Sequence, residues 1–85
     1  MPPNLGRLVK MHRLYAGLTQ DALAVRIGLK PGHGRTYISM LESNRVDPMF
    51  GKVVKIAGAL DLTVVELLTD KAPAATDPTA PAEGE

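Results

Sequence analysis

Residues 19–45, TQDALAVRIGLKPGHGRTYISMLESNR, decide the fold because they contain two short helical patterns joined by a glycine-rich link. The first pattern, residues 20–27, has apolar residues at helical spacing. The Thr19 hydroxyl can cap its start, and Gly28 can end it in a left-handed conformation. Two helices this close together in a chain indicate a helix-turn-helix, and this motif predicts DNA binding.

The second helix of the pair is expected at residues 35–42, after the link at residues 30–34. Ile38 and Leu41 are three positions apart, so they lie on one side of the helix and form its buried stripe. The opposite side is polar. We therefore expect this helix to present polar side chains to the exterior.

Three further helices complete the all-α prediction. The first helix, residues 5–16, has a broad apolar face and ends at Gly17. Asn44 follows the third helix at the position of a left-handed C-terminal cap, and asparagine tolerates this conformation better than most residues other than glycine. The sequence shows no internal repeat and no strand pattern.

The last two helices have start signals of their own. Asp47 is expected to cap the fourth helix, with Pro48 in its first turn, where the missing N–H costs little. Thr63 and Glu66 form a capping box at the start of a short fifth helix, residues 64–69. The expected order therefore places the helix-turn-helix at the second and third of five helices.

Charge divides the chain into two parts. Residues 1–69 hold nine Lys or Arg and five Asp or Glu, a net charge of +4, whereas residues 70–85 hold one Lys and four acids, a net charge of −3. The basic part is compatible with nucleic acid, although an ordinary solvated surface fits the same count. The Ala/Pro-rich acidic segment cannot bury enough apolar surface to fold, so we expect one domain at 1–69 and a disordered tail at 70–85.

Composition argues against several classes of protein. The 85 residues include no cysteine, which excludes disulfides and thiolate chemistry. The apolar runs are far shorter than the roughly 20 residues that span a bilayer, and no signal-peptide pattern is present, so we expect a cytoplasmic, nucleoid-associated protein. The two histidines, His12 and His33, are too few for a zinc site, and no nucleotide-binding or catalytic motif occurs. We expect no metal, no cofactor and no enzymatic activity.

A series of short motifs follows a fixed order between residues 5 and 69: Arg13, Gly17-Leu18-Thr19-Gln20, Leu23-Ala24, Gly28-Leu29, Ile38-Ser39, Leu41-Glu42, Arg45, Pro48, Ala57, Leu60 and Leu67-Leu68. In content and order, this series resembles the Cro/repressor-like (XRE) helix-turn-helix family. The resemblance implies a five-helix, lambda-repressor-like DNA-binding domain.

The sequence departs from the family pattern in the link between the two helices of the motif. Family members have a much shorter link, so residues 31–34 look like an insertion of about four residues. The insertion either changes the angle of the following helix or forms a small loop that reaches the DNA backbone. Asn44 in place of the usual glycine is a milder departure, because both residues accept the left-handed conformation.

The resemblance implies which side chains read bases, because the second helix of the motif lies in the major groove. The corresponding outward positions are Arg35, Thr36, Ser39 and Met40, with Tyr37 at the margin. Arg35 is the leading candidate because its guanidinium can donate two hydrogen bonds to guanine. The alternative for Arg35 is a contact with a phosphate.

The resemblance also implies a set of phosphate contacts, which fix the register on DNA without reading sequence. The candidates are Gln20, Ser43, Arg45, Lys30 and His33. For Gln20 the alternative is a purely local capping role. Four further cations are assigned to solvated helix faces rather than to DNA contacts: Lys10, Arg26, Lys52 and Lys55.

Arg13 and Glu42 are expected to have a structural role. In the family that the chain resembles, the matching residues form a partly buried ion pair between the first helix and the end of the third. Removing one partner of such a pair leaves a desolvated charge. A DNA contact by Arg13 is the less favoured interpretation.

The leading functional hypothesis is a sequence-specific transcriptional regulator, a repressor that binds a palindromic operator as a homodimer. Leu62, Val65 and Leu68 are candidates for a dimer surface near the C-terminus, although they could simply close the core. The alternative is a protein-interaction module, such as the antitoxin of a toxin–antitoxin pair, whose acidic tail folds on a protein partner.

Overall fold

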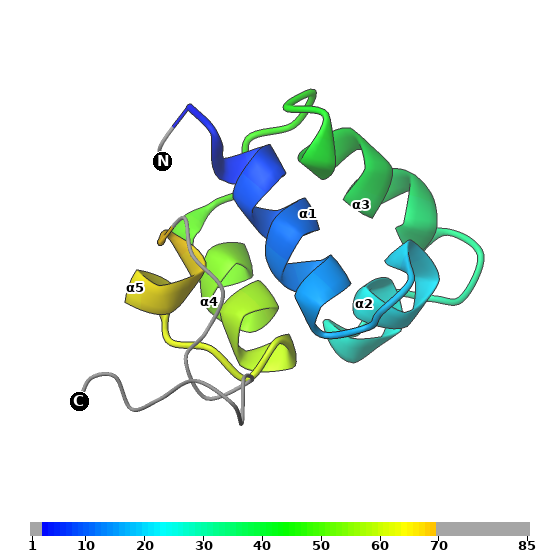
Figure 1. Ribbon diagram of the computed structural model, residues 1–85. Coiled ribbons are helices and arrows are strands. Elements are labelled where there is room, and N and C mark those ends of the chain that lie inside the picture. The colour runs from blue at the N-terminus through cyan, green and yellow to red at the C-terminus, as the bar shows by residue number, and fades with distance from the viewer. Residues whose placement is uncertain (1–2, 70–85) are drawn as a thin grey trace.

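The computed structural model describes residues 3–69 and contains five helices in that range (Figure 1). They are α1 (Leu5–Tyr15), α2 (Gln20–Arg26), α3 (Gly34–Glu42), α4 (Phe50–Ala59) and α5 (Val64–Leu67). No strand occurs within residues 3–69, so the predicted all-α class is confirmed. The acidic tail predicted to be disordered, residues 70–85, lies outside the described residues.

Helix α1 lies at the centre of the fold. Figure 1 shows α2 and α3 on one side of α1, and α4 and α5 on the other. The helices close over one core, which consists of Leu5, Val9, Leu23, Ala24, Ile27, Ile38, Leu41, Val53, Ile56, Ala57, Leu60 and Leu67. Ile38 and Leu41 are 0% and 1% exposed, which confirms their predicted inward direction. No described helix is both long enough and apolar enough to cross a membrane.

Most helix ends follow the local signals in the sequence. The Thr19 hydroxyl accepts a hydrogen bond from the Ala22 N–H at 3.0 Å. Gly17, Gly28 and Asn44 adopt φ values of 73°, 91° and 60°, as predicted for left-handed C-terminal positions. The predicted capping box at Thr63 is also present. These contacts satisfy N–H and C=O groups that a helix leaves unpaired at its ends.

Helix α4 starts later than predicted, and Asp47 is not its cap. Met49 occupies the N-cap position with extended backbone, and its carbonyl accepts from Lys52 and Val53 N–H groups at 2.9 and 3.1 Å. Pro48 is buried, and the backbone is still extended at Met49. No side chain caps the first turn of α4, because Asp47 lies two residues too early.

Smaller differences occur at four other helix ends, one of which is the start of α3, at Gly34 rather than at Arg35. Helices α1 and α2 each end one residue earlier than predicted, at Tyr15 and Arg26, because Ala16 and Ile27 form the caps. Helix α5 is a single turn that ends at Leu67. Helix ends fray, so sequence patterns locate them only to within a residue or two.

Two polar contacts connect α1 and α2 to the C-terminal half. His12 is 2% exposed, and its Nε2 lies 3.0 Å from the Thr69 carbonyl oxygen, so this nitrogen carries the proton and donates. The Arg26 Nη1 donates to the Ala59 carbonyl at 3.1 Å. Arg26 is exposed, as predicted, but it also satisfies a carbonyl at the end of α4.

Two glycines that the sequence did not single out allow α3 to approach its neighbours closely. A Cβ at Gly34 would lie 2.5 Å from the Ala24 Cβ and 2.7 Å from the Leu29 Cβ. A Cβ at Gly6 would lie 2.5 Å from the Leu41 carbonyl oxygen. The Gly6 N–H also donates to the Asn44 side-chain oxygen at 3.2 Å. Both ends of α3 are therefore held by contacts that only glycine permits.

We predict that Gly34→Ala lowers the free energy of unfolding by about 1–3 kcal/mol, because the added methyl group must push α3 away from α2. Gly58→Ala is the control, since a Cβ there meets nothing within 4 Å. The control should be neutral or raise the free energy of unfolding by up to about 1 kcal/mol. Urea denaturation measures both, and equal effects would contradict the close packing at Gly34.

Candidate nucleic-acid interface

The inserted link between α2 and α3 is a closed turn. The Lys30 carbonyl accepts hydrogen bonds from the N–H groups of His33 and Gly34, both at 3.1 Å. Pro31 followed by Gly32 at φ 85° is the residue pattern of a type II turn. The turn leads directly into α3 and leaves Lys30 and His33 exposed at the edge of the helix pair.

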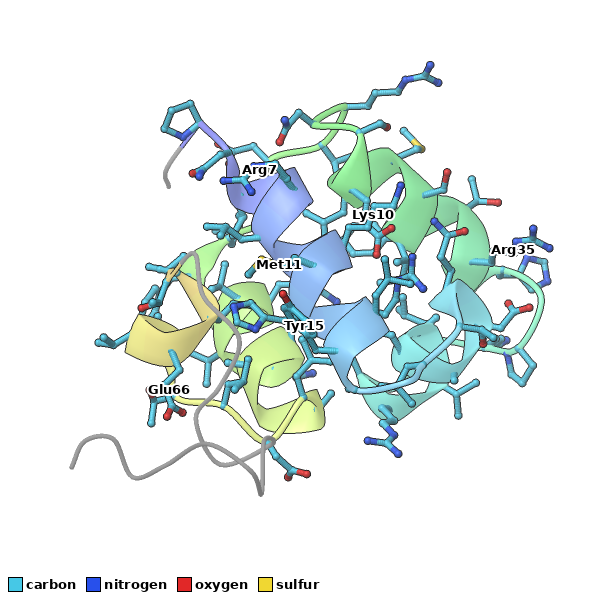
Figure 2. All side chains as sticks on the ribbon, viewed as in Figure 1. Arg7, Lys10, Met11, Tyr15, Arg35 and Glu66 are labelled. Carbon is cyan, nitrogen blue, oxygen red and sulfur yellow. The ribbon has the colours of Figure 1, made fainter. Side chains whose placement is uncertain are left out.

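The outer face of α3 presents four of the predicted base-reading side chains. Arg35, Thr36, Ser39 and Met40 are all exposed, at spacings that place them on one side of the helix. Figure 2 shows Arg35 projecting from the start of α3, away from the body of the protein. These four side chains point outward, as predicted, because Ile38 and the rest of the inner stripe pack against the core on the opposite side of α3.

A shallow hollow between the start of α2 and α3 brings together residues from separate parts of the chain. Its lining consists of Gln20, Arg35, Thr36, Ser39, Met40 and Arg45. A neighbouring hollow continues from Arg35 to the start of α2 and includes Asp21. The first hollow contains two arginines and no acid, so its lining favours an anionic ligand with hydrogen-bond acceptors.

Tyr37 lies apart from this surface. Its ring is partly buried against the core, and the Lys52 ammonium lies 5.6 Å from the ring centroid. Burial raises the pKa of the Tyr37 hydroxyl above its ordinary value of 10.0, so the group stays neutral at physiological pH. The structure therefore groups Tyr37 with α4 rather than with the other predicted base-reading residues.

A buried ion pair fixes the side of α3 that faces α1. The Arg13 Nε lies 2.6 Å from the Glu42 Oε2, and Arg13 Nη2 donates to Glu42 Oε1 at 3.1 Å. The remaining Nη1 donates to the Leu18 carbonyl at 2.7 Å. The two side chains are 8% and 5% exposed, so both charges are almost fully removed from water. Such a pair is stable only because its hydrogen bonds are satisfied.

Gln20 is joined to this ion pair. Its Nε2 donates to the Glu42 Oε1 at 3.2 Å, while the cap of α2 is Thr19. The local capping role considered for Gln20 is therefore filled by its neighbour. Gln20 still lines the hollow, with an amide whose direction is set by Glu42.

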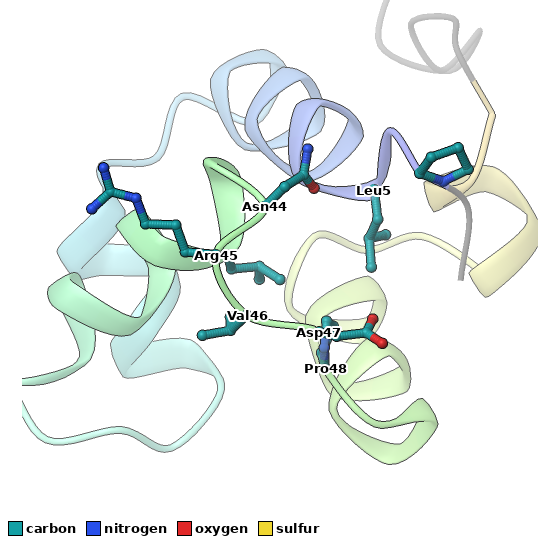
Figure 3. Close-up of a pocket in the computed structure, with 8 residues that line it drawn as sticks. Leu5, Asn44, Arg45, Val46, Asp47 and Pro48 are labelled. Carbon is teal, nitrogen blue, oxygen red and sulfur yellow. The ribbon is translucent and has the colours of Figure 1, made fainter.

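Ser43 and Arg45 differ in their availability for a phosphate. The Ser43 hydroxyl lies 2.9 Å from the Ser39 carbonyl, to which it donates, so it must rotate before it can donate to a ligand. Arg45 is exposed, and its backbone N–H is bonded to the Met40 carbonyl at 2.8 Å. Arg45 also lines a second hollow with Leu5 and Asp47, and Figure 3 shows its side chain extending away from these two residues.

The described residues contain no group of three or more His, Asp or Glu side chains that could hold a metal ion. What residues 3–69 do contain is a tight helix pair whose second helix exposes a polar, arginine-bearing face. The model of the helix-turn-helix family matches residues 9–67, which is most of the chain. The chain belongs to the XRE-type helix-turn-helix family. No individual curated protein is similar enough to add to this match.

This helix-turn-helix protein is a DNA-binding regulator. In the motif, the second helix enters the major groove and the first helix crosses the DNA backbone. Helices α2 and α3 correspond to these two helices, so α3 is the recognition helix. The exposed face described above is the side of α3 that remains accessible to DNA, since the opposite side is buried in the core.

Sequence patterns missed the features that position the recognition helix. The Gln20–Glu42 bond, the Gly6–Asn44 bond and the close approach at Gly34 all join residues far apart in the chain or packed across two helices. One signal was present in the sequence: Gly6 stands inside an otherwise regular helical pattern. A glycine there weakens the helix and indicates a packing reason.

We predict that Glu42→Ala lowers the free energy of unfolding by about 3–5 kcal/mol, because the Arg13 guanidinium is left buried without its partner. Replacing both charges in Arg13→Met/Glu42→Leu should recover most of the loss, since no buried charge remains. Asp21→Ala, at an exposed acid of the same motif, is the control and should change the value by less than about 0.5 kcal/mol.

Urea denaturation followed by circular dichroism gives all three values. A Glu42→Ala effect no larger than that of Asp21→Ala would show that the ion pair does not stabilise the fold.

Proposed function

We propose that the protein is a sequence-specific transcriptional repressor that binds a palindromic operator as a homodimer in the cytoplasm. The observation that supports this function best is the hollow formed by Gln20, Arg35, Thr36, Ser39, Met40 and Arg45. It combines the exposed guanidinium groups of Arg35, at the start of α3, and Arg45, just past its end, with short polar side chains. This combination suits DNA, whose groove presents acceptors and methyl groups between two rows of phosphates.

Each side chain of this face has a chemical role in the proposal. Arg35 donates two hydrogen bonds to O6 and N7 of a guanine. Thr36 and Ser39 donate to base edges, and the methyl group of Thr36 can contact a thymine methyl. Met40, 36% exposed, offers a second apolar contact.

The phosphate contacts flank the base-reading face. Arg45 lies beyond the end of α3, and Gln20 lies at the start of α2. Lys30 and His33 are carried by the closed turn before α3. Because this turn is closed by two backbone hydrogen bonds, it fixes the backbone positions of Lys30 and His33 relative to the start of α3. Such contacts set the register of the helix without reading bases.

Homodimer formation follows from the small size of the base-reading face. One short helix contacts only a few base pairs, whereas specific binding in a genome requires a longer site. Two copies related by a two-fold axis read a palindrome whose half-sites lie about one helical turn apart. Repression requires no further chemistry, because a bound dimer blocks access to the promoter that contains its operator.

We predict that selection from a random DNA library yields two-fold symmetric sites with half-site centres about 10 base pairs apart. Fluorescence anisotropy on a selected site should show affinity that falls steeply as the salt concentration rises, because phosphate contacts release counterions. No binding at low salt would contradict the proposed function. Recovery of single, asymmetric half-sites would contradict the homodimer.

We predict that Arg35→Ala weakens binding to the selected site by about 1–3 kcal/mol and relaxes the preference at one base pair. Lys10→Ala is the matched control, because it removes the same charge from an exposed position on α1. Anisotropy titrations on the selected site and on random DNA separate the two roles of Arg35. Equal losses on both DNAs would identify Arg35 as a phosphate contact.

A further inference from the structure

An exposed apolar cluster lies at the start of α4, outside the DNA-binding face. Met49, Phe50 and Val54 are 83%, 60% and 45% exposed, although all three are large apolar side chains. In the C-terminal region considered above for dimer formation, Leu62 and Leu68 pack against the core, and Val65 alone of the three is exposed. Clusters of exposed apolar residues mark interaction sites in soluble proteins. The start of α4 is therefore the stronger candidate for an interface.

A largely apolar hollow lies beside this cluster. Tyr37, Pro48, Met49 and Gly51 form its apolar part, and Asp47, Lys52 and Lys55 supply its charges. A Cβ at Gly51 would meet nothing within 4 Å, so the backbone of α4 is open to close approach there. Phe50 is not part of the lining, and its exposed ring stands next to the hollow in sequence. The start of α4 thus carries an exposed aromatic ring, and a largely apolar hollow lies beside it.

The charges at this hollow are also self-complementary. Asp47 and Lys55 are both exposed, and neither forms an ion pair within the described residues. Each lies four residues from Gly51, on opposite sides of it in the chain. Asp47 precedes α4 and Lys55 lies on it, but both line the hollow, so in two antiparallel copies of α4 related by a two-fold axis through the hollow, Asp47 of one copy can face Lys55 of the other. A two-fold symmetric contact can therefore form two Asp47–Lys55 ion pairs, one on each side of the axis.

We propose that this face of α4 is the homodimer interface, occupied by a second copy of the chain. Phe50 of each copy enters the hollow of the other, between Tyr37 and Pro48 and beneath the Lys52 ammonium. The proposal rests on the homodimer of the proposed function and specifies its surface. A two-fold axis at α4 relates all elements of the two copies, including the recognition helices, and a palindromic site requires this symmetry. Helix α4 follows α3 after a short connection.

Sedimentation equilibrium of the full chain without DNA tests the apolar part of this contact. We expect a monomer–dimer equilibrium whose dissociation constant rises about tenfold in Phe50→Ala, because a central aromatic side chain is lost. Val65→Ala is the matched control, since it truncates another exposed apolar residue, on α5, and should leave the constant unchanged. Both residues are exposed, so at concentrations well below the dissociation constant, where the chain is monomeric, the melting temperatures should match that of the wild type. A larger effect of Val65→Ala would overturn the proposal in favour of α5.

A charge exchange tests the antiparallel arrangement. Asp47→Lys and Lys55→Asp should each weaken the dimer about two- to fivefold, and the double variant should restore it. Additive losses in the double variant would overturn the pairing of Asp47 with Lys55. This test does not depend on Phe50 and involves no buried residue.

DNA titrations separate the interface from the proposed function. Phe50→Ala should bind a single half-site as tightly as the wild type and lose affinity only for the palindrome. A wild-type chain that stays monomeric in sedimentation, yet binds a half-site, would overturn the interface and leave DNA recognition intact. A Phe50-dependent dimer that binds no DNA would support the interface and overturn the proposed function.

Discussion

The Arg13–Glu42 ion pair is the interaction on which the proposed DNA-binding surface depends. It joins the end of α1 to the end of α3, and through Glu42 it also holds the Gln20 amide at the start of α2. Arg13 additionally bonds the Leu18 carbonyl in the connection between α1 and α2. Three helices therefore meet at one carboxylate and one guanidinium, both nearly buried. Such a pair loses the hydration of two charges, and only the full set of hydrogen bonds offsets that cost.

Close packing supports the same arrangement at the two ends of α3. Gly34 lets the first turn of α3 approach Ala24 and Leu29, and Gly6 lets α1 approach the carbonyl groups at the other end. Asn44 adds a hydrogen bond to Gly6 from a left-handed conformation. Because packed interiors leave little free space, an added methyl group at either glycine would move the helix as a whole. The direction of Arg35 is thus set by contacts on the far side of α3.

The surface of the domain divides according to chemistry. The face of α3 carries arginines and short polar side chains, and the adjoining turn carries Lys30 and His33. The start of α4 carries Phe50 and, beside it, a largely apolar hollow that includes Tyr37. A polar, basic face suits phosphate and base edges, whereas an apolar face with paired charges suits protein. The homodimer proposed above requires one surface of each kind, one for DNA and one for the second copy.

The sequence alone determined the five helices, the N-caps of α2 and α5, the inner stripe of α3 and the family. These features depend on signals a few residues apart, such as Thr19 before α2, the Thr63–Glu66 box, and Ile38 with Leu41. The tertiary structure decided where α4 begins, that Tyr37 turns toward α4, and that Gln20 bonds Glu42. It also decided that His12 meets Thr69, 57 residues away. Local signals reflect the backbone conformation of one segment, whereas these contacts exist only once separate helices pack together.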